Sequence, residues 1–176
     1  SYSRPRANGI IALGLREGDR LIRVTLTDGK SQMLVASYNG KVVRFPEDTV
    51  RPMGRTATGV RAIKLDEDGK DRVVGMICVE EGSQDTVLVI SEKGYGKRTL
   101  LDDENGEPIY RITNRGGKGV KTMNVTDKTG NLIGMEAVND EQDLMLITKS
   151  GTAIRMAMNA ISVLGRATQG VKLIEL

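Results

Sequence analysis

Arginine side chains recur at fixed offsets from repeated glycines along this chain. One arginine lies four residues after the glycine of a recurring turn, at Arg44, Arg98 and Arg155. Another lies four residues before each of three further glycines, at Arg55, Arg115 and Arg166. Cations spaced by a structural repeat suit a phosphate backbone, because each phosphate they neutralise releases counterions whatever the base sequence. The first chemistry that the sequence indicates is therefore polyanion binding.

A glycine-rich loop from Thr113 to Gly119 carries two cations, Arg115 and Lys118. Its three glycines let the backbone approach a ligand closely and turn its N–H groups outward, as in the nests that hold phosphate oxygens. The loop does not match the nucleotide-binding pattern Gly-x-x-x-x-Gly-Lys-Ser/Thr, because Val120 follows Gly119 and the spacing differs. We predict a phosphate contact here, and a loop that is only flexible and basic is the alternative.

The composition argues against catalysis and against single-stranded ligands. The chain has no histidine and one cysteine, Cys78, so Ser/His and Cys/His catalysis and histidine metal sites are excluded. Cys78 lies in an apolar segment and is expected to pack in a buried strand. With one Phe, four Tyr and no Trp, the chain also lacks the platforms on which single strands stack. We expect a non-catalytic domain without a cofactor, and duplex as the nucleic acid that binds.

A repeating scaffold must position these cations, and the sequence contains one. Four glycine-led apolar segments begin at Gly9, Gly59, Gly119 and Gly170, at spacings of 50, 60 and 51 residues. Their partial period of two predicts strands. Each complete unit continues with a second apolar segment, at residues 21–24, 73–76 and 132–135. A hairpin follows, with turns at residues 37–40, 91–94 and 148–151.

Four short strands in roughly 50 residues are the period of a propeller-like blade. We therefore predict an all-β fold that forms one domain, with units at approximately residues 4–53, 54–113 and 114–164 and a partial unit at 165–176. The fourth unit stops after its first strand, so we expect the chain to be a piece of a longer array. Its unpaired sheet edges would need partners or protection.

Charge is sorted by position in the repeat. Residues 149–172 carry four bases and no acid, whereas residues 65–92 carry eight acids and two bases. Because repeats stack in one orientation, we expect the bases to form one continuous stripe, with ordinary solvated surface as the alternative. The candidate DNA-binding cations are Arg4, Arg6, Lys41, Arg44, Arg51, Arg55, Lys97, Arg98, Arg115, Lys118, Lys121, Lys149, Arg155 and Arg166.

Together these residues resemble the C-terminal β-pinwheel domain family of DNA gyrase A subunits, within the type IIA topoisomerases. The resemblance spans essentially the whole chain, and its most specific stretches are residues 2–10, 43–47, 50–60 and 94–99. It implies a β-pinwheel, with about three and a fraction of the blades of an array of about six. In that family neighbouring blades exchange strands, and a basic rim wraps DNA in support of negative supercoiling.

The same resemblance implies partners and a partial motif. The expected partners are double-stranded DNA, the gyrase B subunit, and the remainder of the gyrase A subunit. The family's box, Gln-Arg-Arg-Gly-Gly-Lys-Gly, is matched only partly, because Thr113 and Asn114 replace its Gln and first Arg. We take Arg115–Gly119 as a box-like loop and expect the true box to precede Ser1, so that this piece could bind DNA without wrapping it fully.

A second function remains open, a propeller-like platform for protein interactions, which the same architecture and the acidic loops would serve. No apolar run approaches the roughly 20 residues of a membrane span, and no signal peptide is evident at the N-terminus. We therefore expect a cytoplasmic protein without membrane partners.

Overall fold

The computed structural model describes residues 13–176. Arg4, Arg6 and the strand expected at Gly9 lie outside the described residues. The strands are β1 (Gln32–Ser37), β2 (Lys41–Pro46), β3 (Val73–Val79), β4 (Thr86–Ser91), β5 (Tyr95–Leu100), β6 (Val120–Lys121), β7 (Leu132–Val138), β8 (Asp143–Ile147), β9 (Ala153–Ala157) and β10 (Val171–Lys172). Two single-turn 3-10 helices, η1 (Glu47–Thr49) and η2 (Met158–Ala160), follow β2 and β9. Over residues 13–176, no helix has the length and hydropathy needed to span a bilayer.

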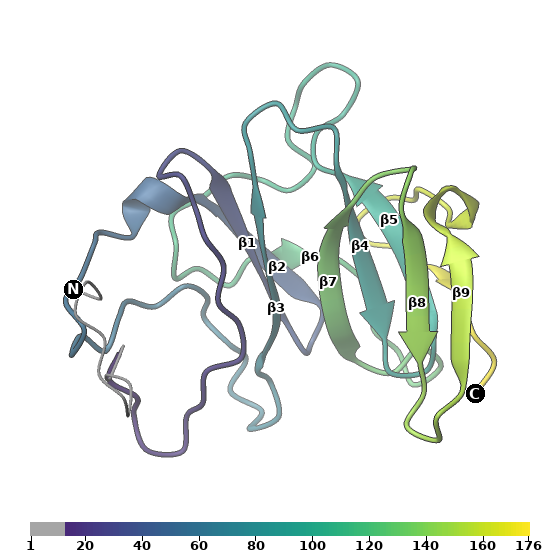
Figure 1. The fold of residues 1–176 in the computed structure, drawn as a ribbon, viewed down its shortest axis with the longest axis horizontal. Coiled ribbons are helices and arrows are strands. Elements are labelled where there is room, and N and C mark those ends of the chain that lie inside the picture. Colours follow the sequence, from purple (N-terminus) through teal and green to yellow (C-terminus); the bar gives the residue numbers. More distant parts are fainter. Residues whose placement is uncertain (1–12) are drawn as a thin grey trace, which may run out of the picture.

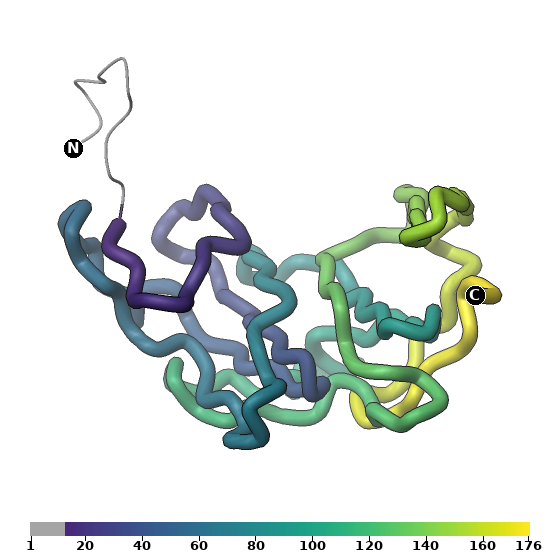
Figure 2. The backbone as a smooth tube through the Cα atoms, turned by 90° about the horizontal axis from the view of Figure 1, so that it is seen from below, coloured from purple at the N-terminus to yellow at the C-terminus, as the bar shows by residue number. Residues whose placement is uncertain are grey.

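The strands form three antiparallel sheets that succeed one another from the N-terminal to the C-terminal end (Figure 1). The strand orders are β3-β1-β2-β6, β10-β5-β4-β7 and β8-β9. Each sheet is built on a hairpin, and in the first two sheets strands from later repeats flank that hairpin on both sides. Figure 2 shows the green segment near residues 110–125 running along the first sheet before the chain returns to the second sheet at β7. The all-β, propeller-like prediction is confirmed, and strand exchange between blades accompanies it.

The hairpin turns depend on glycines in the left-handed backbone region. Gly40, Gly94 and Gly151 have φ of 88°, 84° and 92°, values that only glycine adopts without strain. Space is also short at Gly94, where an added Cβ would lie 2.7 Å from the carbonyl oxygen of Ile174.

The main core lies between the first two sheets. Its buried side chains come from the facing strands and include Leu34, Val42, Ile77, Val87, Leu132 and Met135. Gly75 permits a close approach of β3 to β7, because a Cβ there would lie 3.1 Å from the Cβ of Met135. Cys78, expected to pack in a buried strand, lies in β3, where it is half-buried and packs against a second apolar cluster.

Two expected strands are absent. Residues 21–24 and 59–65 contain no strand, and Val24 and Leu26 are 75% and 94% exposed. The segments equivalent to 21–24 are β3 and β7, each of which pairs with the hairpin of the preceding repeat. Likewise, β6 and β10 follow Gly119 and Gly170 and pair with preceding hairpins. Residues 13–176 contain no hairpin before β1, so these two segments have no ladder to join.

The repeat glycines offer a matched test of backbone packing. Gly59 and Gly119 have φ of 87° and 79°. An added Cβ meets nothing within 4 Å at Gly59, but at Gly119 it clashes with the Val42 carbonyl oxygen. Gly59→Ala should therefore lower the free energy of unfolding by only about 1–2 kcal/mol, the cost of left-handed backbone. Gly119→Ala should cost at least about 3 kcal/mol, because β2 must also move. Urea denaturation measures both, and equal losses would contradict the close approach of Gly119 to β2.

Candidate nucleic-acid interface

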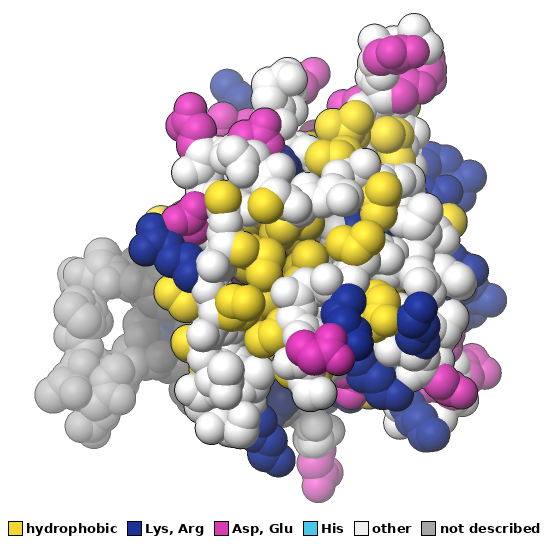
Figure 3. Space-filling model, turned by 90° about the vertical axis from the view of Figure 1, so that its right-hand side faces the viewer, with side chains coloured by type: hydrophobic (Ala, Val, Ile, Leu, Met, Phe, Trp, Pro, Cys, Tyr) yellow, Lys and Arg dark blue, Asp and Glu magenta, His cyan; other side chains and the backbone are white. Residues whose placement is uncertain are grey.

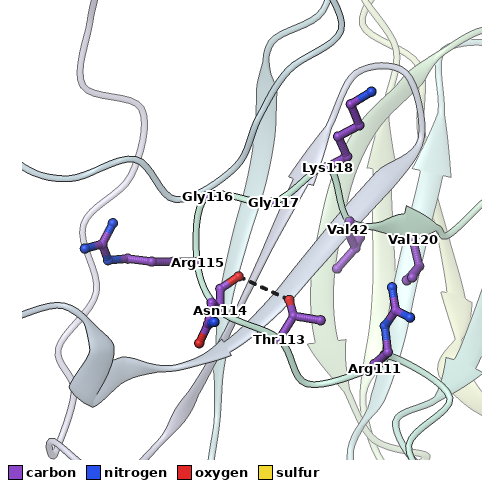
Figure 4. A pocket seen from close by; sticks show the side chains of 10 residues that line it. Val42, Arg111, Thr113, Asn114, Arg115, Gly116, Gly117, Lys118 and Val120 are labelled. Atoms are coloured by element: carbon purple, nitrogen blue, oxygen red, sulfur yellow. Dashed lines mark hydrogen bonds between the residues drawn. The ribbon is translucent and has the colours of Figure 1, made fainter.

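The glycine-rich loop at residues 113–119 lies between β5 and β6 along the chain, and it leads directly into β6. Thr113 donates its backbone N–H to the Arg44 carbonyl at 2.8 Å, which ties the start of the loop to β2. Gly116 and Gly119 have φ of 86° and 79°, so both require the left-handed region that favours glycine. A hollow of about 520 Å³ opens beside the loop and is lined by Arg111, Lys118 and the loop backbone (Figure 4).

The loop also packs against the preceding segment of chain. Gly116 donates its N–H to the Ala62 carbonyl at 2.7 Å, and the Gly117 carbonyl accepts the Lys64 N–H at 2.8 Å. Among the described residues, the N–H groups of Gly117 and Lys118 donate to no acceptor. Two neighbouring amides that have no acceptor in this part of the chain, beside a lysine, are what an anion-binding nest requires.

Five cations surround this loop and the short β6 strand: Lys41, Arg111, Lys118, Lys121 and Arg166. We call them the basic rim. Lys41 and Lys121 are direct cross-strand partners in the β2–β6 ladder, and Arg166 donates from Nη1 to the Lys121 carbonyl at 2.6 Å. Like charges placed opposite each other in a sheet are destabilising, so this arrangement favours an anionic ligand.

The rim cations have few acidic partners. Within residues 13–176, Arg111, Lys118, Lys121 and Arg166 form no ion pair, and Lys41 approaches Asp66 only at 4.0 Å. These side chains remain available to phosphates, in contrast to the paired arginines described below.

Arg111 was not among the DNA-binding residues predicted from the sequence, although its position in the repeat gave a signal for it. Arg51 and Arg111 both lie eight residues before a repeat glycine, Gly59 and Gly119. Arg51 lines a second hollow, of about 490 Å³. It lies in the loop of the preceding repeat that is equivalent to residues 111–119, and this loop also contains Arg55. Both arginines of that second loop are exposed. The same offset therefore identifies a matching pair of loop arginines.

Three predicted DNA-binding cations lie in the interior instead. Arg44 is 6% exposed and donates to Gln32, Asp102 and the carbonyls of Leu101 and Tyr110. Arg98 is 4% exposed and donates to Thr86, Asp140 and the carbonyl of Met158. The repeat does register these arginines at equivalent points, but those points lie inside the blades. We therefore leave Arg44 and Arg98 out of the proposed DNA contacts.

Lys97 is the third interior cation and is fully buried. Burial, together with repulsion from Arg166, lowers the pKa of Lys97 to about 8. Its ammonium donates to the carbonyls of Gly165 and Arg166 and to the Thr168 hydroxyl. A phosphate has no access to this group, so Lys97 also leaves the set of proposed contacts.

The remaining predicted cations are half-buried or exposed. Arg115 donates from Nε to the Thr49 carbonyl at 3.1 Å and from Nη1 to the Arg61 carbonyl at 3.3 Å, which leaves Nη2 for a ligand. In Figure 4 its side chain points away from that of Lys118. Arg155 is exposed and pairs with Asp143 at 2.6 Å, and Lys149 is exposed in the β8–β9 turn.

The face that carries β8 and β9 has a different character. Figure 3 shows hydrophobic side chains gathered over its middle, with lysine and arginine side chains around them, most densely at the lower right. Met145 and Ile147 are 55% and 72% exposed there. This surface is apolar and offers little to a phosphate backbone.

Comparison with known proteins identifies a family for this chain. A sequence model described as the C-terminal, β-propeller domain of DNA gyrase matches residues 1–28, 32–80, 85–139 and 142–176. The chain is 47% identical over 176 residues to the DNA gyrase A subunit of Staphylococcus aureus strain MRSA252, covering 100% of this chain and 19% of that protein. The same identity and coverage hold for the protein of strain N315. The chain thus spans about a fifth of the length of these relatives.

Solved structures share the fold. A C-terminal domain of DNA topoisomerase IV superposes with a TM-score of 0.87 at 21% identity, covering 99% of this chain and 52% of that chain. A DNA gyrase A C-terminal domain superposes with a TM-score of 0.82 at 24% identity, covering 96% of this chain and 55% of that chain. These likenesses support the propeller-like arrangement of the blades.

Proposed function

The chain belongs to the DNA gyrase C-terminal domain family, and from this membership we propose that it holds double-stranded DNA by its phosphates along the basic rim. The observation that carries the proposal is the cluster of rim cations, four of which form no ion pair within residues 13–176. Lys121 faces Lys41 across the β2–β6 ladder and supports Arg166 through its carbonyl. A phosphate backbone would relieve the repulsion between these cations, and such contacts are independent of base sequence.

We further propose that the domain is non-catalytic and bends duplex in support of negative supercoiling by a gyrase holoenzyme in the bacterial cytoplasm. Smoothly bending a site of 20–30 base pairs costs on the order of 1–6 kcal/mol. Several phosphate contacts must offset that cost. Arg51 and Arg55, which are exposed in the equivalent loop of the preceding repeat, would supply further contacts.

A salt titration of duplex binding tests the proposal. Five rim cations that each neutralise one phosphate predict a slope of about −4.5 for the logarithm of the association constant against the logarithm of salt concentration. Fluorescence anisotropy with a labelled random duplex of about 40 base pairs, long enough for several phosphate contacts, measures that slope. Base-scrambled duplexes should bind with equal affinity. Absence of binding at low salt, or binding indifferent to salt, would exclude the proposal.

The second candidate function, a platform for protein partners, is favoured by the apolar surface over β8 and β9 (Figure 3). Met145 and Ile147 are exposed there. Neutralising the basic rim separates the two functions, because it removes duplex binding but leaves a partner on this apolar face unaffected.

A further inference from the structure

Lys97 is a buried lysine at a position where other repeats carry aliphatic side chains. It lies three residues after the turn glycine Gly94, and the corresponding residues after Gly40 and Gly151 are Val43 and Ile154. Burying a charge is costly unless it is paired or fully hydrogen-bonded. A lysine at this site therefore needs compensating hydrogen bonds, which a valine does not.

The ammonium of Lys97 makes three hydrogen bonds, which provide this compensation. Lys97 Nζ donates to the carbonyls of Gly165 and Arg166 at 2.6 and 2.7 Å and to the Thr168 hydroxyl at 3.0 Å. An ammonium has three donors, and all three are used on one turn, residues 165–168. Lys97 itself belongs to β5, so these bonds join the second sheet to a loop of a later repeat.

This turn carries Arg166, a member of the basic rim. The loops at residues 113–119 and 165–170 are repeat equivalents, and both bond the same way to the preceding chain. The Gly117 carbonyl accepts the Lys64 N–H, as the Thr168 carbonyl accepts the Asn124 N–H. In both loops, the arginine Nη1 also donates to a backbone carbonyl of the preceding segment.

One anchor of the first loop has no counterpart in the second. Gly116 donates its N–H to the Ala62 carbonyl at 2.7 Å, whereas the N–H of the equivalent residue, Ala167, has no acceptor among the described residues. At the second loop, the Lys97 ammonium provides three bonds from inside the turn instead. In the first blade the same position is Val43, which makes no such bonds.

From these contacts we propose that Lys97 is a positioning residue, whose ammonium fixes the turn at 165–168 and thereby holds Arg166 on the basic rim. Its importance for DNA rests on the function proposed above, but its effect on the turn does not. Lys97 itself touches no ligand.

A double-mutant cycle with Arg166 tests this role. Arg166→Ala should weaken duplex binding about tenfold, the loss of roughly one phosphate contact. Lys97→Met, which keeps the length of the side chain without its charge, should weaken binding by a similar factor. The double variant should bind no more weakly than either single variant, because both changes remove the same contact. Val43→Met, at the equivalent buried position of the first blade, is the control and should leave affinity unchanged.

Amide hydrogen exchange gives a readout that needs no DNA. Lys97→Met should accelerate exchange at the amides of Thr168 and Asn124, which bond within and to the turn. Val43→Met should not. Unchanged exchange in Lys97→Met would overturn the proposal, as would multiplying effects in the cycle or an Arg166→Ala variant with full affinity. If the unmodified chain binds no duplex, the DNA-binding function fails, and the exchange measurement still decides whether Lys97 positions the turn.

The pH dependence of stability provides a further check on the burial of Lys97. The pKa of Lys97 is lowered from 10.5 to about 8 in the folded chain, by burial first and by Arg166 second. Between these values the unfolded state binds more protons, so this group makes stability rise with pH across that window. The free energy of unfolding of the unmodified chain should therefore rise relative to that of Lys97→Met between pH 8 and pH 10. A flat difference would contradict the buried ammonium.

Discussion

Arg98→Glu should lower the free energy of unfolding by about 3–5 kcal/mol, whereas Arg155→Glu, at the same position of the next repeat, should change it by less than about 1 kcal/mol. Arg98 is 4% exposed, and its guanidinium donates hydrogen bonds to the Thr86 hydroxyl, the Met158 carbonyl and the Asp140 carboxylate. A glutamate there would place a carboxylate among acceptors and near another carboxylate. The side chain of Arg155 is 70% exposed, so a glutamate there is solvated.

Chemical denaturation followed by circular dichroism measures this contrast. Equal losses of stability in the two variants would show that the Arg98 site is not the buried one described here. The contrast also shows how DNA binding should be tested. A combined reversal of Arg44, Arg98 and Arg155 would unfold the blades and abolish binding for a reason unrelated to phosphates.

The repeat and its hairpins could be predicted because their signals are local. A tight turn needs a glycine at positive φ, and Gly40, Gly94 and Gly151 mark the three hairpins in sequence and in structure alike. A short apolar run before each turn completes the pattern. The fold class therefore follows from features that lie within about 15 residues of one another.

The pairing of strands was harder to predict because it crosses repeats. Residues 21–24 have the same apolar pattern as β3 and β7, yet they form no strand. A strand exists only where a neighbour supplies hydrogen-bond partners, and β3 and β7 find theirs on hairpins about 40 residues earlier. Local pattern alone does not reveal whether that neighbour is present.

The division of cations between surface and interior was also out of reach of the sequence. Lys97 and Arg98 are adjacent, so their side chains point to opposite faces of β5, and yet both are buried. The reason is that β5 is a central strand, lying between β10 and β4, with both faces covered. Phase in the repeat indicated where these cations recur, but only the packing of neighbouring blades shows which of them reach solvent.

The rim lysines should govern DNA affinity without supporting the fold. Lys118→Gln combined with Lys121→Gln should weaken duplex binding about 100-fold, on the basis of roughly tenfold for each lost phosphate contact. The salt slope should become less negative by about 2, roughly one unit for each contact. Stability should be unchanged or slightly higher, because removing Lys121 relieves its repulsion with Lys41 across the ladder.

A matched control separates position from net charge in this experiment. Lys30→Gln combined with Lys70→Gln removes the same charge from exposed sites outside the rim. That double variant should keep both the affinity and most of the salt slope. If the two double variants weaken binding equally, the attraction comes from the overall charge of the chain. If only the rim variant does so, the cations gathered around the β2–β6 ladder hold the duplex, because net charge is identical in the two proteins and only its placement differs.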